Sequence, residues 1–253
     1  MKSLNELIKT IETLRSPQGC PWDKEQTFKT LIPCIIEECY ELVEAIESDN
    51  SEHIIEECGD VLLQVVMIAT IANETQLFSL QSIAEHVNTK MIKRHPHVFK
   101  HTTIKTSKDV LQQWESIKQN EKPSQSNMDN IPPLPALVKA EKIQKKAAQD
   151  GFDWNHTHDA IKKIKEEVNE FNHELKQNHN QDTLEEEAGD LLFSIINVLR
   201  KENINPETAL RKANHKFISR YKTMESLSPN FKSLSLEKKE VLWKKAKQLT
   251  QSK

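Results

Sequence analysis

A helical pattern that occurs twice decides the fold of this chain. Residues 183–202 read TLEEEAGDLLFSIINVLRKE, and residues 53–72 read HIIEECGDVLLQVVMIATIA. In both, acidic residues are followed by apolar residues at the three- and four-residue spacing of an α-helix. Each stretch also holds a glycine, Gly59 or Gly189, which costs a helix about 1 kcal/mol relative to alanine. Such a glycine is tolerable where another helix or a ligand must approach the backbone closely.

Other motifs repeat at a separation of about 126–132 residues. All four glycines of the protein fall inside the matched blocks. The blocks are GCPW at 19–22 with GFDW at 151–154, EExxE at 37–41 with 166–170, EExGD at 56–60 with 186–190, KxxxR at 90–94 with 216–220, and WxxxK at 114–118 with 243–247. Self-similarity at a fixed period indicates tandem copies of one structural unit.

The rest of the chain is also predicted to be helical, because apolar residues recur at helical spacing and no alternating strand pattern is evident. Predicted helices cover residues 3–14, 28–48, 52–73, 80–94, 108–119, 136–148, 157–177, 183–202, 207–226 and 236–250. Three of these helices have expected start signals at their N-termini. The signals are Ser51 before Glu52, Asp182 with Glu185, and Asn205-Pro206. The stretch 119–135, QNEKPSQSNMDNIPPLP, is polar and proline-rich, which is typical of a linker. We therefore expect an all-α protein with tandem helical-bundle domains at 1–118 and 136–253.

The composition argues against a nucleic-acid-binding or membrane-spanning protein and favours a cytoplasmic one. Residues 1–120 carry 12 basic and 18 acidic side chains, and the remainder carries 23 and 20. Neither half has the strongly basic character of a nucleic-acid-binding domain. The four cysteines form no CxxC pair, so reduced thiols in a cytoplasmic protein are expected. No apolar run approaches the roughly 18 residues that a membrane span needs.

Acidic residues in each repeat fall on one side of two neighbouring helices. Glu166, Glu167 and Glu170 lie within an arc of about 100°, and Glu187 and Asp190 share a face because they are three residues apart. The matched acids of the first repeat are Glu37, Glu38, Glu41, Glu57 and Asp60. The simplest interpretation is a solvated acidic face opposite an apolar stripe. In residues 157–177 that stripe is Ile161, Ile164, Val168, Phe171 and Leu175.

Three observations favour a metal site instead. Clustered like charges at these spacings repel each other unless a cation is present. A glycine interrupts each acidic helix, and the whole arrangement occurs twice. Carboxylates from two antiparallel helices form an all-oxygen ligand set, which suits a hard cation such as Mg²⁺ or Mn²⁺.

EExxE followed after 15 or 16 residues by ExxD resembles the signature of the all-α nucleoside triphosphate pyrophosphohydrolases. The two-domain layout, CPWD at 20–23, RHPHVF at 94–99 and GFDW at 151–154 resemble the MazG family within that group. The resemblance covers residues 1 to about 250. It implies a helical bundle completed by homodimerisation, and Mg²⁺-dependent cleavage of nucleoside triphosphates to monophosphate and pyrophosphate in nucleotide-pool housecleaning. It also implies that the second domain is the main catalytic one.

The resemblance assigns roles to individual residues. It implies metal ligation by Glu167, Glu170, Glu187 and Asp190, with Glu166 orienting or deprotonating the attacking water. It implies nucleotide binding by Lys163, Glu166, Lys216, Arg220 and Trp243. The equivalent first-domain site is Glu37, Glu38, Glu41, Glu57, Asp60, Lys90 and Arg94. The simpler alternatives are a solvated cationic face for the basic residues and core packing for Trp243 and Trp154. His95 and His97, which flank Pro96, are expected to be structural or interfacial.

Two other functions use related features. A di-iron carboxylate bundle needs two Glu-x-x-His motifs, but only Glu170-x-x-His173 has this form, because Glu44 stands at the matched position of the first repeat. A nucleotide sensor or dimeric scaffold would use the acids to bind metal without turnover, which is most credible for the first repeat. Pyrophosphate release, an iron chromophore, or binding without turnover would distinguish the three.

Overall fold

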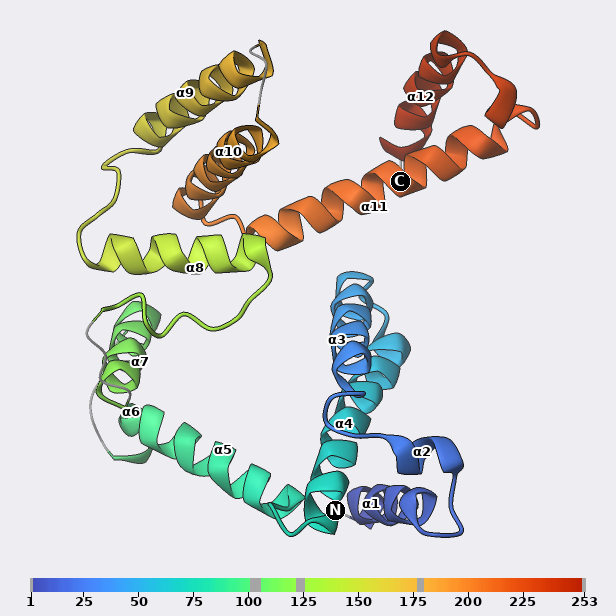
Figure 1. The fold of residues 1–253 in the computed structure, drawn as a ribbon, viewed down its shortest axis with the longest axis vertical. Helices are drawn as coiled ribbons and strands as arrows, with labels where there is room; N and C mark the ends of the chain where they lie inside the picture. Colours follow the sequence, from blue (N-terminus) through green and yellow to red (C-terminus); the bar gives the residue numbers. More distant parts are fainter. Residues whose placement is uncertain (1, 101–105, 122–125, 177–179, 252–253) are drawn as a thin grey trace. The chain divides into compact units, whose positions relative to one another are not determined.

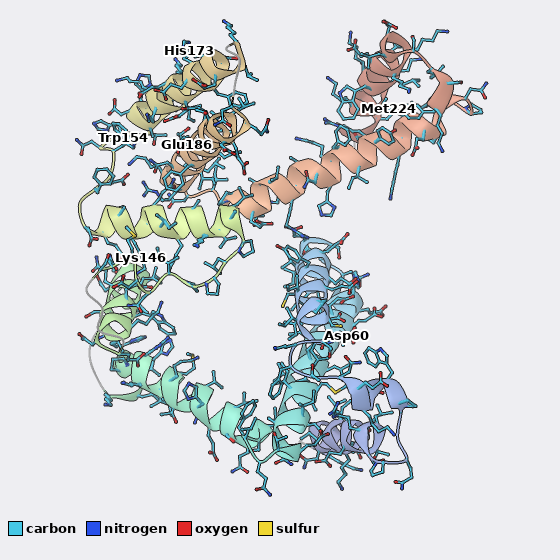
Figure 2. All side chains as sticks on the ribbon, viewed as in Figure 1. Asp60, Lys146, Trp154, His173, Glu186 and Met224 are labelled. Atoms are coloured by element: carbon cyan, nitrogen blue, oxygen red, sulfur yellow. The ribbon has the colours of Figure 1, made fainter. Side chains whose placement is uncertain are left out.

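The computed structural model describes residues 2–100, 106–121, 126–176 and 180–251 (Figure 1). Every regular element in these ranges is helical, which confirms the predicted all-α class. The chain divides into two compact units, Met1–Glu121 and Lys122–Lys253. Residues 126–135, expected to be linker, belong to the second unit. Asn127 donates a hydrogen bond to the backbone carbonyl of Lys146. The buried Lys146, which is labelled in Figure 2, donates one to the Asn127 side chain.

The first unit is built on a pair of long helices. Its elements are α1 (Lys2–Arg15), α2 (Pro21–Glu25), α3 (Ile32–Glu47), α4 (Ser51–Glu74), α5 (Leu80–Arg94), α6 (Pro96–Phe99) and α7 (Ser107–Glu121). Helices α3 and α4 pack side by side, and α1 lies against α4. Ile11, Leu31, Val66 and Met67 form the buried core where these helices meet.

The second unit repeats this plan. Its elements are α8 (Ala136–Gln149), α9 (Thr157–Lys176), α10 (Gln181–Lys201), α11 (Pro206–Ser226), a 3₁₀ turn at Phe231–Ser233, and α12 (Leu236–Gln251). Helices α9 and α10 form the most extensive helix pair, α8 packs on α10, and α12 folds back along α11 (Figure 1). Met224, Phe231 and Ala246 are buried between α11 and α12 (Figure 2).

All ten predicted helices are present among the described residues, although residue 177, the expected end of α9, lies outside them. The short elements α2, α6 and the 3₁₀ turn were not predicted, since each is too short to show a period. Helix α3 begins at Ile32 rather than at 28. Thr27 and Thr30 exchange backbone-to-hydroxyl hydrogen bonds of 2.8 and 3.2 Å, and this local turn competes with helix formation.

Two of the three predicted helix starts are wrong by one or two residues. Asn50 caps α4 by accepting hydrogen bonds from the backbone of Glu52 and His53, and Asn180 caps α10 by accepting one from Asp182. Asparagine is among the best N-cap residues because its short side chain reaches the free N–H groups of the first turn. The third start is confirmed, since Asn205 caps α11 and Pro206 follows at the first helical position.

Much apolar surface remains exposed in each unit taken alone. Exposed apolar residues occur on α3, α9, α10 and α11; examples are Ile36, Val43, Ile161, Val168, Leu175, Leu192, Phe217 and Ile218. Helices with one apolar stripe normally bury it. No helix in the described part of the chain is long and apolar enough to cross a membrane.

Candidate metal and nucleotide site

The acids of the second repeat lie where α9 and α10 pack together. Glu167 is only 4% exposed, and carboxylate oxygens of Glu167, Glu170 and Glu187 all lie within 4.8 Å of one another. Burial and the neighbouring charge of Glu167 raise the pKa of Glu170. Burial, Asp190 and Glu167 raise the pKa of Glu187. The folded chain thus holds these negative charges close together at an energetic cost that a cation would relieve.

The burial of Glu167 argues against a simple solvated acidic face. On the same helix, Ile161, Val168 and Leu175 of the apolar stripe remain 38%, 38% and 45% exposed. The face that α9 turns towards α10 therefore includes the acidic edge, while much of the apolar stripe stays exposed in the single chain. Glu166 and Glu170 are exposed at the rim of this interface.

Lys163 supplies the cation nearest to these acids. It lies one turn before Glu167 on α9, and its Nζ is 2.7 Å from Oε1 of both Glu166 and Glu167. These two hydrogen bonds raise the pKa of Lys163 above its ordinary value. The lysine therefore stays protonated and partly neutralises the cluster.

A cavity of about 720 Å³ opens beside the acids. Lys163, Glu167 and Asp190 line it, together with the aromatic rings of Phe152, Trp154 and Phe193. Trp154 lies three residues before the start of α9 (Figure 2) and is 44% exposed. A lining that combines ionic groups with apolar rings suits a ligand with a charged and an aromatic part.

The turn that carries Trp154 is fixed by a glycine and an ionic cluster. Gly151 adopts a φ of +85°, and the N–H groups of Gly151 and Phe152 close the end of α8 on the carbonyls of Ala148 and Ala147, as in a Schellman motif. The Asp153 carboxylate then accepts hydrogen bonds from Arg200 at 2.5 Å and Lys201 at 3.3 Å. Although burial opposes the shift, these cations lower the pKa of Asp153.

Asp153 and Arg200 also line the cavity, although neither was predicted from the sequence. Asp153 holds Arg200 there. The aspartate of GFDW was the available signal, but its partner lies 47 residues away on α10. Nothing in the spacing of the two residues connects them.

Lys216, Arg220 and Trp243, the other expected nucleotide-binding residues, lie on α11 and α12. Trp243 packs against Phe217 with ring centroids 5.3 Å apart, and the Arg220 guanidinium lies 5.7 Å from the Trp243 ring centroid. None of the three expected residues lines the cavity beside the acids. A single chain brings together the acids, Lys163 and Trp154, but it does not bring these three residues to them.

The first unit holds the matched acid cluster between α3 and α4. Oxygens of Glu38, Glu41 and Glu57 lie within 4.8 Å of one another, and Glu57 is only 6% exposed. Burial and the charges of Asp60, Glu41, Glu57 and Glu37 raise the pKa of Glu38. Asp60 lies on α4 (Figure 2), and Glu37 is exposed.

The helical glycines beside both clusters face open space. A Cβ atom added at Gly59 or Gly189 would meet no other atom within 4 Å. Close helix packing within one chain therefore does not explain them. Asp60 and Asp190 directly follow these glycines in the sequence.

Arg94, one of the two basic residues expected at the first-domain site, already has partners. Arg94 donates to Glu121 at 2.6 Å and lies 5.5 Å from the Trp114 ring centroid. The hydrogen bond from Arg94 lowers the pKa of Glu121. In the second unit Thr250 stands where Glu121 does, and its hydroxyl oxygen accepts a 3.3 Å hydrogen bond from Arg220. Lys90 is half-buried on α5.

The two histidines around Pro96 hold α5 and α7 together. The His95 ring meets Trp114 edge-on at 4.8 Å, and His97 Nδ1 lies 3.3 Å from Gln113 Oε1. Both contacts lie within the first unit. His173 belongs to none of the metal-competent groups found among the described residues, so the di-iron alternative gains no support.

Comparison with known proteins identifies both repeats. A family model described as the MazG nucleotide pyrophosphohydrolase domain matches residues 26–99 and 156–224. The chain is 47% identical over 249 residues to the Thermotoga maritima protein named nucleoside triphosphate pyrophosphohydrolase/pyrophosphatase MazG, covering 96% of this chain and 94% of the relative. It is 40% identical over 257 residues to the Escherichia coli K12 nucleoside triphosphate pyrophosphohydrolase, covering 98% of each. A Bacillus subtilis protein, uncharacterized protein YabN, is 43% identical over 245 residues, which are 94% of this chain and 50% of that protein.

Proposed function

Since the chain belongs to the MazG nucleotide pyrophosphohydrolase family, we propose that it hydrolyses nucleoside triphosphates to the monophosphate and pyrophosphate at the α9–α10 acid cluster. The observation that carries this proposal is the convergence of Glu167, Glu170 and Glu187 within 4.8 Å beside a cavity. The cavity also offers a lysine for phosphate and aromatic rings for a base. The same chemistry would accept many triphosphates, which supports a housecleaning role in the nucleotide pool of the cytoplasm.

Magnesium is the proposed cofactor, with Mn²⁺ as a substitute. The donors are all carboxylate oxygens, the ligand type that Mg²⁺ prefers. Burial, together with the charge of neighbouring carboxylates, raises the pKa values of Glu170 and Glu187, and a bound cation would offset both effects. Glu167, Glu170, Glu187 and Asp190 would hold the metal. When bound, it would neutralise phosphate charge and lower the pKa of a coordinated water.

The protein's own side chains would orient the substrate and accept the proton of the attacking water. Glu166, exposed beside Glu167, would orient that water and accept its proton. Its Oε1 is now 2.7 Å from Lys163 Nζ, and a triphosphate would compete for that ammonium. The Asp153–Arg200 pair fixes one wall of the cavity and keeps Trp154 next to it.

The second unit is the proposed catalytic unit because its arginine lacks a competing carboxylate. Glu121 already neutralises Arg94 in the first unit. Among the described residues, Arg220 contacts only the neutral Thr250 hydroxyl and the Trp243 ring. Arginine binds phosphate through two parallel hydrogen bonds. A guanidinium that is not paired with a carboxylate is better able to do so.

A homodimer would complete this site. Lys216, Arg220 and Trp243 do not line the cavity of their own chain, and exposed apolar residues such as Val168 and Phe217 lie on α9 and α11. We propose that a second copy covers these apolar faces and brings its own α11–α12 hairpin to the acids.

Product analysis tests the proposed reaction. With Mg²⁺ and each triphosphate in turn, early time points should show monophosphate and pyrophosphate in equal amounts. Early sampling matters because the Thermotoga relative is also named a pyrophosphatase. EDTA should abolish turnover, and Mg²⁺ or Mn²⁺ should restore it. Diphosphate with orthophosphate as the first products, or turnover that survives chelation, would contradict the proposal.

A further inference from the structure

We propose that the first unit contains a second kind of metal site, formed by His53, Glu56 and Glu57 on α4, which takes a nitrogen-preferring divalent transition metal. It lies outside the unit to which the proposed hydrolysis is assigned. Among the described residues, ligand atoms of these three side chains lie within 4.8 Å of one another. Residues three and four apart share a helix face, so one turn of α4 presents all three together.

The distance between His53 and Glu57 fits a shared ion. His53 Nε2 lies 3.1 Å from Glu57 Oε1. Two neighbouring ligands at right angles, each about 2.1 Å from a metal, are about 3.0 Å apart. A metal could therefore enter between these atoms with little movement of either side chain. The His53 side chain is 41% exposed, which leaves a path from solvent.

The environment of Glu57 favours a bound cation at this position. This carboxylate is 6% exposed, its Oε1 faces His53, and its Oε2 is buried without a hydrogen-bond partner among the described residues. A buried, unpaired carboxylate oxygen is costly. Glu57 also belongs to the cluster with Glu38 and Glu41. It could therefore bridge two adjacent sites, an all-oxygen one and one that includes the imidazole.

The second repeat lacks the imidazole. Thr183 stands at the position matched to His53, although Glu186 and Glu187 match Glu56 and Glu57. Imidazole favours metals such as zinc, nickel and cobalt, whereas Mg²⁺ takes oxygen ligands. The two repeats should therefore differ in metal preference through one residue.

Cobalt binding to the full-length protein tests this inference. Co²⁺ is titrated in excess Mg²⁺, which occupies all-oxygen sites, and binding is followed by calorimetry and visible absorption. The wild-type protein should bind one Co²⁺ per chain under these conditions. His53→Gln should weaken this binding at least about tenfold. The matched control His86→Gln, which removes an exposed histidine of the same unit, should not change it.

A variant that gains a Co²⁺ site keeps the inference testable even if His53→Gln does not fold. Thr183→His should create a second Co²⁺ site that resists Mg²⁺, without any change to the first unit. Equal Co²⁺ binding by wild type and His53→Gln would overturn the proposal. An intense near-ultraviolet thiolate charge-transfer band would also overturn it, since it would place the metal on cysteines such as Cys58. These readouts measure Co²⁺ binding and do not depend on nucleotide hydrolysis. A failure of this inference is therefore distinguishable from a failure of the proposed function.

Discussion

At the scale of single residues, Lys163 and the expected metal compete for the same carboxylate. The lysine Nζ lies 2.7 Å from Glu167 Oε1, and Glu167 is the buried member of the cluster. A metal ion that binds Glu167 must displace this ammonium or share the carboxylate with it. Once displaced, the lysine is free to contact a phosphate.

Lys163→Met should therefore affect metal and substrate in opposite directions. We expect tighter Mn²⁺ binding without nucleotide, by about twofold to fivefold. This corresponds to roughly 0.4–1 kcal/mol, which lies within the range measured for exposed ion pairs. We also expect a higher KM for the triphosphate. Electron paramagnetic resonance of free Mn²⁺ and steady-state kinetics measure the two effects.

Lys162→Met is the matched control for this prediction. Lys162 pairs with Asp159 at 2.8 Å on the same helix, not with the cluster. It should leave both quantities unchanged. Weaker Mn²⁺ binding by Lys163→Met would show that the lysine supports the metal site rather than competing with it.

At the scale of elements, the α9–α10 pair stores electrostatic repulsion. The pKa values of Glu170 and Glu187 are raised. A group whose pKa is raised by folding favours the folded state most fully at low pH, and this contribution is lost as pH rises through the folded pKa. At neutral pH the two ionised carboxylates therefore destabilise the metal-free protein.

Magnesium should raise the unfolding temperature most at neutral pH. As the pH falls towards the raised pKa values of Glu170 and Glu187, protons replace the metal, so the stabilisation by Mg²⁺ should shrink. The unfolding temperature is compared with and without Mg²⁺ at each pH. This comparison removes the effects on stability of other titrating groups, such as Asp153, whose pKa is lowered. Stabilisation by Mg²⁺ that is independent of pH would contradict the assignment of these carboxylates as ligands.

The long helices could be predicted from the sequence because their apolar period is strong, but their packing could not. Periodicity finds the stripe of Ile161, Val168 and Leu175 without revealing that it remains exposed while Glu167 is buried against α10. The clustering of Glu167, Glu170 and Glu187 could be predicted from the spacing of these acids along their helices. The Asp153–Arg200 pair could not be predicted, because it depends on how the turn after α8 meets the end of α10.

At the scale of the whole molecule, the exposed apolar stripes predict association. The double substitution Val168→Glu and Leu175→Glu places charges on the α9 stripe and should dissociate the dimer into monomers, which sedimentation would detect. Because we propose that a second copy supplies cations to the acids, activity should fall when the dimer dissociates. Asn169→Glu adds a charge to an exposed position of the same helix outside the stripe and should leave the dimer intact. A fully active wild-type monomer at micromolar concentration would rule out this part of the proposal.

The two repeats share a plan but are not equivalent. Each pairs an arginine with a tryptophan at similar distances, 5.5 Å for Arg94 and 5.7 Å for Arg220. Only in the first repeat does the arginine also form an ion pair with a carboxylate, that of Glu121. This difference predicts that one acid cluster turns over triphosphates while the other does not.

Steady-state pyrophosphate release by Asp190→Asn and Asp60→Asn tests this central claim most directly. Each substitution keeps the size of the side chain and removes one negative charge from a matched cluster, where charge count helps to set affinity for a hard cation. With circular dichroism confirming the fold of both variants, Asp190→Asn should lower the rate by orders of magnitude and Asp60→Asn should retain most of it. Equal losses, or a selective loss with Asp60→Asn, would contradict the assignment of catalysis to the second unit.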